Sequence, residues 1–183
     1  MTPILGIMAS QISGHLVAPI TGSMFHIAST TLSTTATDVT FGSIPADYTH
    51  LQIRYITYAG NGGYLSMQFN ADTASNYRWH YLNGNGATAS AGDGGADTRI
   101  AMPRGAGVAN MFGAGVIDIL DYANTNKYKT ARGIGGRDTN NSDGNLDFNS
   151  GLWRNTNAIT SIKLYHAGVD LQAYASYALY GVK

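Results

Sequence analysis

The stretch that decides the fold runs from Thr49 to Asp72 and reads "THLQIRYITYAGNGGYLSMQFNAD". Apolar residues occupy every second position in its two halves: Leu51, Ile53, Tyr55, Leu65, Met67 and Phe69. A period of two is typical of β-strands that bury one face. Between the halves lies "GNGG", residues 60–63, which is rich in turn-forming residues. The stretch therefore predicts two strands joined as a β-hairpin.

The same alternation continues through most of the chain from Met24 onward, and no segment carries a sustained helical stripe. Further strands are predicted within residues 23–33, 38–44, 75–84, 98–104, 113–123, 127–136, 145–153, 159–168 and 171–183. The run 113–123 is almost continuously apolar, which indicates a central strand. Residues 83–97, "NGNGATASAGDGGAD", read as a long low-complexity loop that is mobile or functional. About ten short strands predict an all-β, antiparallel sandwich or barrel, with one helical turn or a loop between Leu152 and Ile159.

The composition limits the kinds of partner. Net formal charge is zero and charged residues make up 12% of the chain, against ~25% in typical proteins. All eleven acidic residues are Asp, and there is no cysteine. Nucleic acids and anionic lipids are recognised through basic surfaces, so we expect no nucleic-acid or membrane partner. The lack of cysteine excludes disulfides and thiolate metal sites.

The first 22 residues differ from the rest, and we divide the chain into an apolar arm, residues 1–22, and a β-sandwich domain, residues 23–183. Polar residues interrupt the apolar run and the first Lys or Arg is Arg54, which fits a cleaved secretion signal poorly. Two interpretations remain open: a first strand of the same domain, or an arm that docks on a neighbouring subunit. For the second, the contact residues are Ile4, Leu5, Ile7, Met8, Ile12, Leu16 and Val17.

No residue set predicts catalysis or metal binding strongly. Asp118 and Asp121 are the best carboxylate pair for a glycosidase, but Asp121 is better explained by a pairing with Lys127 or Lys129. The five histidines lack metal-ligand spacing and are expected to pack or to form hydrogen bonds. Three acidic residues near one loop offer an irregular Ca²⁺ site as an alternative: Asp138, Asp143 and Asp147. We predict no catalytic residue, no metal and no cofactor.

The segment "NYRWHYLNGNG" places Tyr77, Trp79 and Tyr81 on one face of a predicted strand. Exposed Tyr and Trp rings beside Asn and Asp suit carbohydrate binding, through ring stacking and hydrogen bonds to hydroxyls. Three aromatic residues on one face equally fit a core or a subunit contact. The sequence leaves these interpretations open.

Six segments of the chain resemble a group of structural proteins from tailed-bacteriophage virions: "PILGIMASQISGHL", "FGSIPADYTHLQIRY", "MQFNADTASNY", "VIDILDYANTNKYKT", "SGLWRNTNAITSIKL" and "YASYALYGVK". Members of the group are small head-decoration or fibre-like proteins and terminal domains of tail fibres. The resemblance covers nearly the whole chain and weakens in residues 83–97. It implies a jelly-roll-like β-sandwich, a location in the virion, and no catalytic or metal-binding residues.

Within that group the chain has no repeat that would build a fibre shaft. A compact domain with a short apolar arm is typical of a capsid decoration or cement protein, so this is the predicted function. The predicted partners are other virion proteins, either the major capsid protein or tail proteins, together with copies of the chain in a homotrimer. The alternatives are a tail-fibre or receptor-binding module that recognises host surface glycans, and a glycan-degrading enzyme.

Overall fold

The computed structural model describes residues 22–60, 62–139 and 144–183. These residues form twelve β-strands: β1 Met24–Thr31, β2 Val39–Phe41, β3 His50–Thr57, β4 Tyr64–Phe69, β5 Tyr77–Gly84, β6 Ala89–Asp97, β7 Ile100–Arg104, β8 Gly113–Leu120, β9 Lys129–Arg137, β10 Asn145–Trp153, β11 Ile162–His166 and β12 Ser176–Val182. No helix occurs in this part of the chain, so nothing described here could cross a membrane as a helix. The segment between Leu152 and Ile159 is a loop beyond the end of β10.

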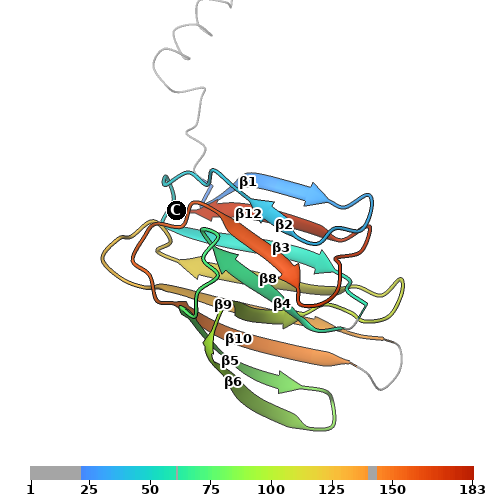
Figure 1. Cartoon of the computed structure of the whole chain (residues 1–183). Helices are drawn as coiled ribbons and strands as arrows, with labels where there is room; N and C mark the ends of the chain where they lie inside the picture. The colour runs from blue at the N-terminus through green and yellow to red at the C-terminus, as the bar shows by residue number, and fades with distance from the viewer. Residues whose placement is uncertain (1–21, 61, 140–143) are drawn as a thin grey trace, which may run out of the picture.

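The strands form two antiparallel sheets, which confirms the predicted all-β sandwich with twelve strands where about ten were expected (Figure 1). The larger sheet has the order β1-β12-β3-β8-β9-β10-β5-β6 and the smaller sheet has the order β2-β11-β4-β7. Eight strands, β1-β12-β3-β8 facing β2-β11-β4-β7, follow the arrangement of a jelly roll. Strands that follow one another along the chain alternate between the two sheets in this part of the fold.

The other four strands extend only the larger sheet. The β9–β10 hairpin pairs with β8, and the β5–β6 hairpin pairs with β10. In Figure 1 these strands continue downward, and β5 and β6 lie below the strands of the smaller sheet. The last strand of the smaller sheet, β7, packs against β9, β10 and β5. The larger sheet therefore reaches beyond the part that the smaller sheet covers.

The predicted hairpin between residues 49–60 and 64–72 is wrong, although both of its strands exist. β3 pairs with β12 and β8, whereas β4 pairs with β11 and β7 in the other sheet. Bridges from Tyr58 to Ala106 and from Ala59 to Leu171 hold the chain as it crosses between the sheets. Gly62 has φ +59°, a backbone conformation that favours glycine, so the glycine-rich segment serves a crossing rather than a hairpin turn.

The expectation of a long loop over residues 83–97 is also wrong. Most of this segment is β6, which pairs with β5, and only residues 85–88 form the turn between them. The side chain of Asn85 accepts hydrogen bonds from the backbone N–H groups of Ala87 and Thr88, which closes the turn. Pairing with β5 satisfies the backbone hydrogen bonds of this segment, although its small side chains show no alternation of apolar and polar residues.

The core lies between the smaller sheet and the strands that it covers. Its largest members are Trp153 and Tyr77, whose rings stack at 6.3 Å with Phe69 beside both. The Tyr77 hydroxyl accepts a hydrogen bond from the backbone N–H of Phe69 in β4. A buried Tyr hydroxyl usually has a hydrogen-bond partner. Here that hydrogen bond joins β5 of the larger sheet to β4 of the smaller sheet.

A histidine is among the titratable groups buried in the described core. His166, in β11, is 3% exposed and lies against Gly105. Burial lowers the pKa of His166 to about 4, and the smaller effect of the Tyr64 backbone acts in the opposite direction. The folded protein therefore holds this imidazole in its neutral form over most of the pH range.

We expect His166 to make the fold sensitive to mild acid. Because its pKa is lower in the folded chain than the ~6.5 of an unfolded one, its contribution to stability is complete above pH ~6.5 and is lost as pH falls toward 4. His166→Gln should remove up to about 3 kcal/mol of the change in unfolding free energy between these pH values. Urea unfolding of the parent and the variant at both pH values measures this change in unfolding free energy, with the exposed His80→Gln as the matched control. Identical pH profiles for the parent and His166→Gln would contradict the assignment.

Candidate functional site

The outer surface of the larger sheet carries large apolar side chains that nothing in the described structure covers. Leu82, Ile134, Leu146 and Phe148 are 55%, 56%, 62% and 46% exposed. They alternate along β5, β9 and β10 with residues that face the inside of the sandwich. With Ile56 and Val116 they form a surface that we call the outer apolar face.

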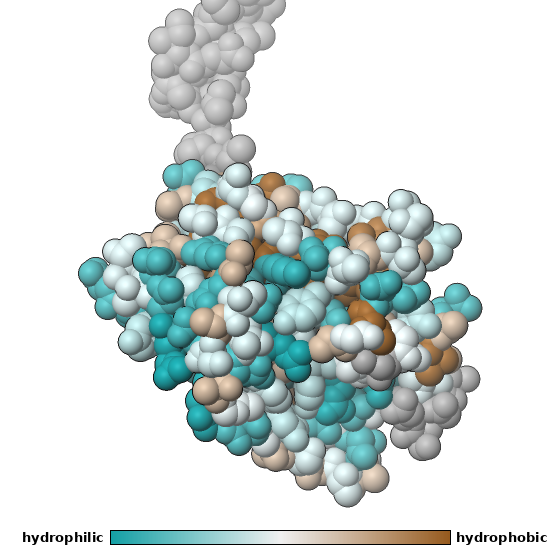
Figure 2. All heavy atoms as spheres, in the orientation of Figure 1, coloured by the Kyte–Doolittle hydropathy of each residue, from teal (hydrophilic) through white to brown (hydrophobic). Residues whose placement is uncertain are grey.

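The strand register makes this face continuous. Phe148 lies directly opposite Leu82 on one side and Ile134 on the other, and Ile134 lies opposite Val116. A second row passes through Leu146 and the small residues Gly136 and Ala114 to Ile56. Neither row contains a charged residue between β5 and β8. On the side of the molecule seen in Figure 2, by contrast, hydrophilic residues dominate and apolar ones are scattered.

A polar row borders this face at the next outward-facing position of each strand. It contains His80, Ser150, Arg132, Asp118 and Gln52. The carboxylate of Asp118 accepts a hydrogen bond of 2.9 Å from the Gln52 side chain. An apolar area with a polar rim is the usual anatomy of a protein–protein contact.

Asp118 and Asp121 do not converge on a common site. Asp118 bonds to Gln52 on the sheet surface, whereas Asp121 follows the end of β8 and pairs with Lys127. The hydrogen bond from Lys127 holds the pKa of Asp121 below its usual value. The predicted pairing of Asp121 with Lys127 is therefore confirmed, and Lys129 instead donates to the backbone carbonyls of Asn124, Lys127 and Thr156.

The alternative of a Ca²⁺ site finds no support in the described residues. Asp143 lies outside them. Asp147 is fully buried and contacts Asn83 and Arg104, so it does not share a loop surface with Asp138. Among the residues that the structure describes, no three His, Cys, Asp or Glu side chains are grouped to hold a metal ion.

The histidines within these ranges have different surroundings. His26 contacts the ring of Tyr180 edge-on, and Nδ1 of His50 accepts a hydrogen bond from the backbone N–H of Asp121. His80 is exposed on the outer side of β5 and His166 lies in the core. His15 and the predicted arm contacts lie outside the described residues, namely Ile4, Leu5, Ile7, Met8, Ile12, Leu16 and Val17.

The three aromatic residues of β5 share one face, as predicted, but have different environments. Tyr77 is completely buried in the core, so it is not available to a glycan or a second subunit. Trp79 and Tyr81 lie farther along β5 and remain partly exposed. The smaller sheet covers Tyr77 and does not fully cover the other two.

A third ring, from β4, joins Trp79 and Tyr81. The Tyr64 ring lies 5.8 Å from Trp79 and 5.6 Å from Tyr81, tilted by about 50° to each. We call Tyr64, Trp79 and Tyr81 the aromatic cluster. Sequence spacing along β5 could not reveal Tyr64, because β4 belongs to the other sheet.

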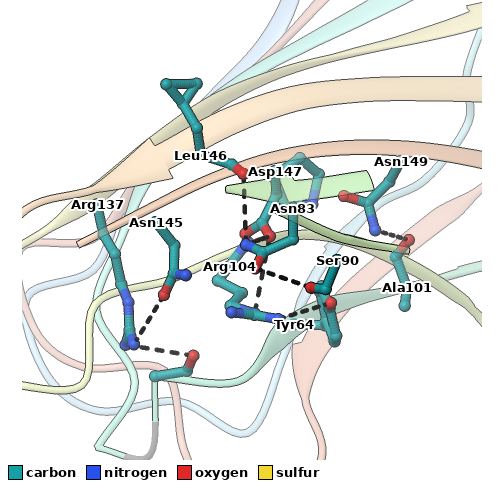
Figure 3. A network of polar contacts seen from close by, with 12 residues as sticks. Tyr64, Asn83, Ser90, Ala101, Arg104, Arg137, Asn145, Leu146, Asp147 and Asn149 are labelled. Carbon is teal, nitrogen blue, oxygen red and sulfur yellow. Dashed lines mark hydrogen bonds and ion pairs between the residues drawn. The ribbon is translucent and has the colours of Figure 1, made fainter. Parts of the chain in front are cut away.

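A buried polar network holds the wall of this cluster (Figure 3). The Arg104 guanidinium donates a hydrogen bond of 2.7 Å to the Tyr64 hydroxyl and lies over the ring of Tyr64. Asp147 accepts hydrogen bonds from the Arg104 backbone N–H, at 3.1 Å, and from the Asn83 side chain, at 2.8 Å. Burial raises the pKa of Tyr64, with the Arg104 hydrogen bond acting in the opposite direction, so the hydroxyl stays neutral.

We expect Asp147 to be essential for the junction of the two sheets. Asp147→Ala removes the acceptor of the Arg104 backbone N–H and one of the two acceptors of the Asn83 amide, and it removes the negative partner of the Arg104 guanidinium. The change should cost about 3–5 kcal/mol of unfolding free energy. The exposed pair Arg78–Asp93, at 2.7 Å, provides the control. Asp93→Ala should cost less than about 1 kcal/mol in the same urea titration. Similar losses for both variants would show that the buried network does not stabilise the fold.

Comparisons of the chain with family models, with curated proteins and with solved structures gave no match. The functions of the outer apolar face and the aromatic cluster must therefore be argued from their geometry and chemistry.

Proposed function

We propose that this chain is a structural protein of a tailed-bacteriophage virion that acts by packing against other virion proteins, as a capsid decoration or cement protein. The observation that supports the proposal most directly is the outer apolar face. The sequence resemblance to virion structural proteins supplies the biological setting. In this proposal the protein stabilises or covers the head through contact area and catalyses no reaction.

The chemistry of the outer apolar face suits a lasting contact. Fully burying one large apolar side chain contributes about 1.5–3 kcal/mol. Leu82, Ile134, Leu146 and Phe148 each have roughly half of their surface left to bury. The four together would then contribute about 3–6 kcal/mol before the costs of ordering and association. Since the two rows carry no charge between β5 and β8, burying that part of the face desolvates no ion.

Repetition would strengthen this contact in a virion. A decoration protein is present in many copies, and a homotrimer would offer several faces to one neighbour at once, which raises the overall avidity. Few charged residues and a net charge of zero keep the mutual repulsion of closely packed copies low. The arm, residues 1–22, adds a second apolar contact in this proposal, through Ile4 to Val17 on a neighbouring subunit.

A charge placed in the centre of the outer apolar face should abolish assembly without unfolding the protein. Phe148→Asp lies on the sheet surface between Leu82 and Ile134, so the variant should fold while its face repels an apolar partner. Sedimentation of labelled protein with purified heads made without it measures binding, and circular dichroism checks the fold. The control, Tyr128→Asp, changes an exposed aromatic residue just before β9, at the end of that strand away from the face. Equal binding by both variants would remove the face from the proposal.

Deletion of residues 2–20 tests the arm separately. The described fold begins at β1, so the truncated protein should retain its strands and its cooperative thermal unfolding. It should lose its oligomer or its attachment to heads, as measured by light scattering and by the same sedimentation assay. Unfolding of the truncated protein would instead make the segment part of the domain core.

Labelled antibody on intact particles distinguishes the two virion positions. Electron microscopy should place the label over the capsid if the chain is a decoration or cement protein. Label at the tail end would favour the alternative of a tail-fibre or receptor-binding module.

A further inference from the structure

The aromatic cluster lies where the smaller sheet ends and the β5–β6 hairpin extends beyond it. Tyr64 comes from β4 in the smaller sheet, and Trp79 and Tyr81 come from β5 in the larger one. All three rings are half-buried. In the adjacent core, the rings of Tyr77 and Trp153 are fully buried and stacked. The cluster is therefore a partly open continuation of the aromatic core.

Glycines in β6 let the rings of Trp79 and Tyr81, both in β5, lie flat against the β6 backbone. Gly94 pairs with Trp79 and Gly92 pairs with Tyr81. A Cβ atom at Gly94 would lie 2.2 Å from the indole, and one at Gly92 would lie 2.7 Å from the phenol ring. Each ring thus lies against bare backbone. Their planes differ by 33° and their centres lie 6.1 Å apart, which makes them a nearly continuous platform.

Hydrogen bonds fix this platform and its wall. The Trp79 indole N–H donates to the Asp97 carboxylate at 2.9 Å, and the other oxygen of Asp97 accepts from the backbone N–H of Thr98. The Tyr64 ring forms the wall, held by Arg104 from behind. Rings that are already ordered lose little conformational entropy when a ligand binds.

We propose that the aromatic cluster binds a neutral hexopyranose unit of a surface glycan, a binding function beyond assembly into a virion. The apolar C–H face of such a sugar stacks on the rings of Trp79 and Tyr81, while its hydroxyl groups bond to the Tyr64 and Tyr81 hydroxyls and to Asp97. Aromatic surfaces with a few fixed polar groups are typical of small-ligand sites.

The charges around the cluster select against acidic sugars. The Arg104 guanidinium lies 3.8 Å from the fully buried carboxylate of Asp147, so its charge is already compensated. Asp97 presents a second carboxylate at the platform itself. A sialic or uronic acid would therefore meet the negative charge of Asp97 at the platform.

Tryptophan fluorescence provides a direct test, because the chain has two tryptophans and Trp153 is only 1% exposed. Acrylamide quenching then reports on Trp79. Lactose and maltotriose are the neutral probes and sialyllactose is the acidic one, alongside an array of neutral and acidic glycans. At least one neutral sugar should protect Trp79 from quenching and bind at least about tenfold more tightly than its acidic counterpart.

Two variants separate binding from folding. Trp79→Ala, measured by calorimetry, should weaken sugar binding at least about tenfold. Gly94→Ala keeps the indole but places a methyl group where it lies, so it should also weaken binding while both tryptophans remain. Tyr128→Ala, an exposed aromatic residue elsewhere, should bind as the parent does.

Absence of any neutral glycan signal on the array, or unchanged binding by both Trp79→Ala and Gly94→Ala, would overturn the proposal. Loss of self-association in these two variants, without sugar binding by the parent, would identify the cluster as a subunit contact and overturn it equally. Phe148→Asp should bind sugar normally, so the result is independent of the outer apolar face.

Discussion

A sandwich can bury only as much of its larger sheet as its smaller sheet covers, and this constraint shapes the whole molecule. The larger sheet has eight strands and the smaller sheet has four. Where they overlap, side chains such as Tyr77 and Trp153 are removed from water. Beyond the overlap, the inner surface keeps the half-buried rings of Trp79 and Tyr81, whereas the apolar side chains of the outer surface face away from the smaller sheet along the whole larger sheet. The half-open aromatic cluster therefore follows from the unequal size of the sheets.

Small residues make the extension possible. β7 packs against β9 and β10, and a Cβ atom at Gly133 or Gly135 would collide with Pro103 of β7. On β6, Gly92 and Gly94 accept the rings of β5 in the same way. The glycines at these positions therefore let the sheets and strands approach closely.

The sequence predicted the strands well and their partners poorly. Period-two alternation identifies residues such as Leu51 and Leu65 as inward-facing, and both are fully buried. The alternation does not say which strands pair with each other. The turn-like residues 60–63 therefore suggested a hairpin between β3 and β4 that does not form. β6 was missed because glycine and alanine give no hydrophobic alternation, and its strand character comes from pairing with β5. Likewise, the spacing of Tyr77, Trp79 and Tyr81 predicted a common face but not which ring the smaller sheet would cover.

The order of pairing at the extended edge has a consequence for synthesis of the chain. The β5–β6 hairpin joins the sheet only through β10, which begins at Asn145, whereas β5 begins at Tyr77. The hairpin ends at Asp97, so at translation rates of about 5–20 residues per second it is complete roughly 2–10 s before synthesis of β10 begins. During that interval Trp79, Tyr81 and Leu82 have no sheet to join, and two-stranded hairpins alone are marginally stable in water. The hairpin can therefore join the sheet only after β10 has been made, and slower synthesis lengthens the interval in which its side chains lie open to water.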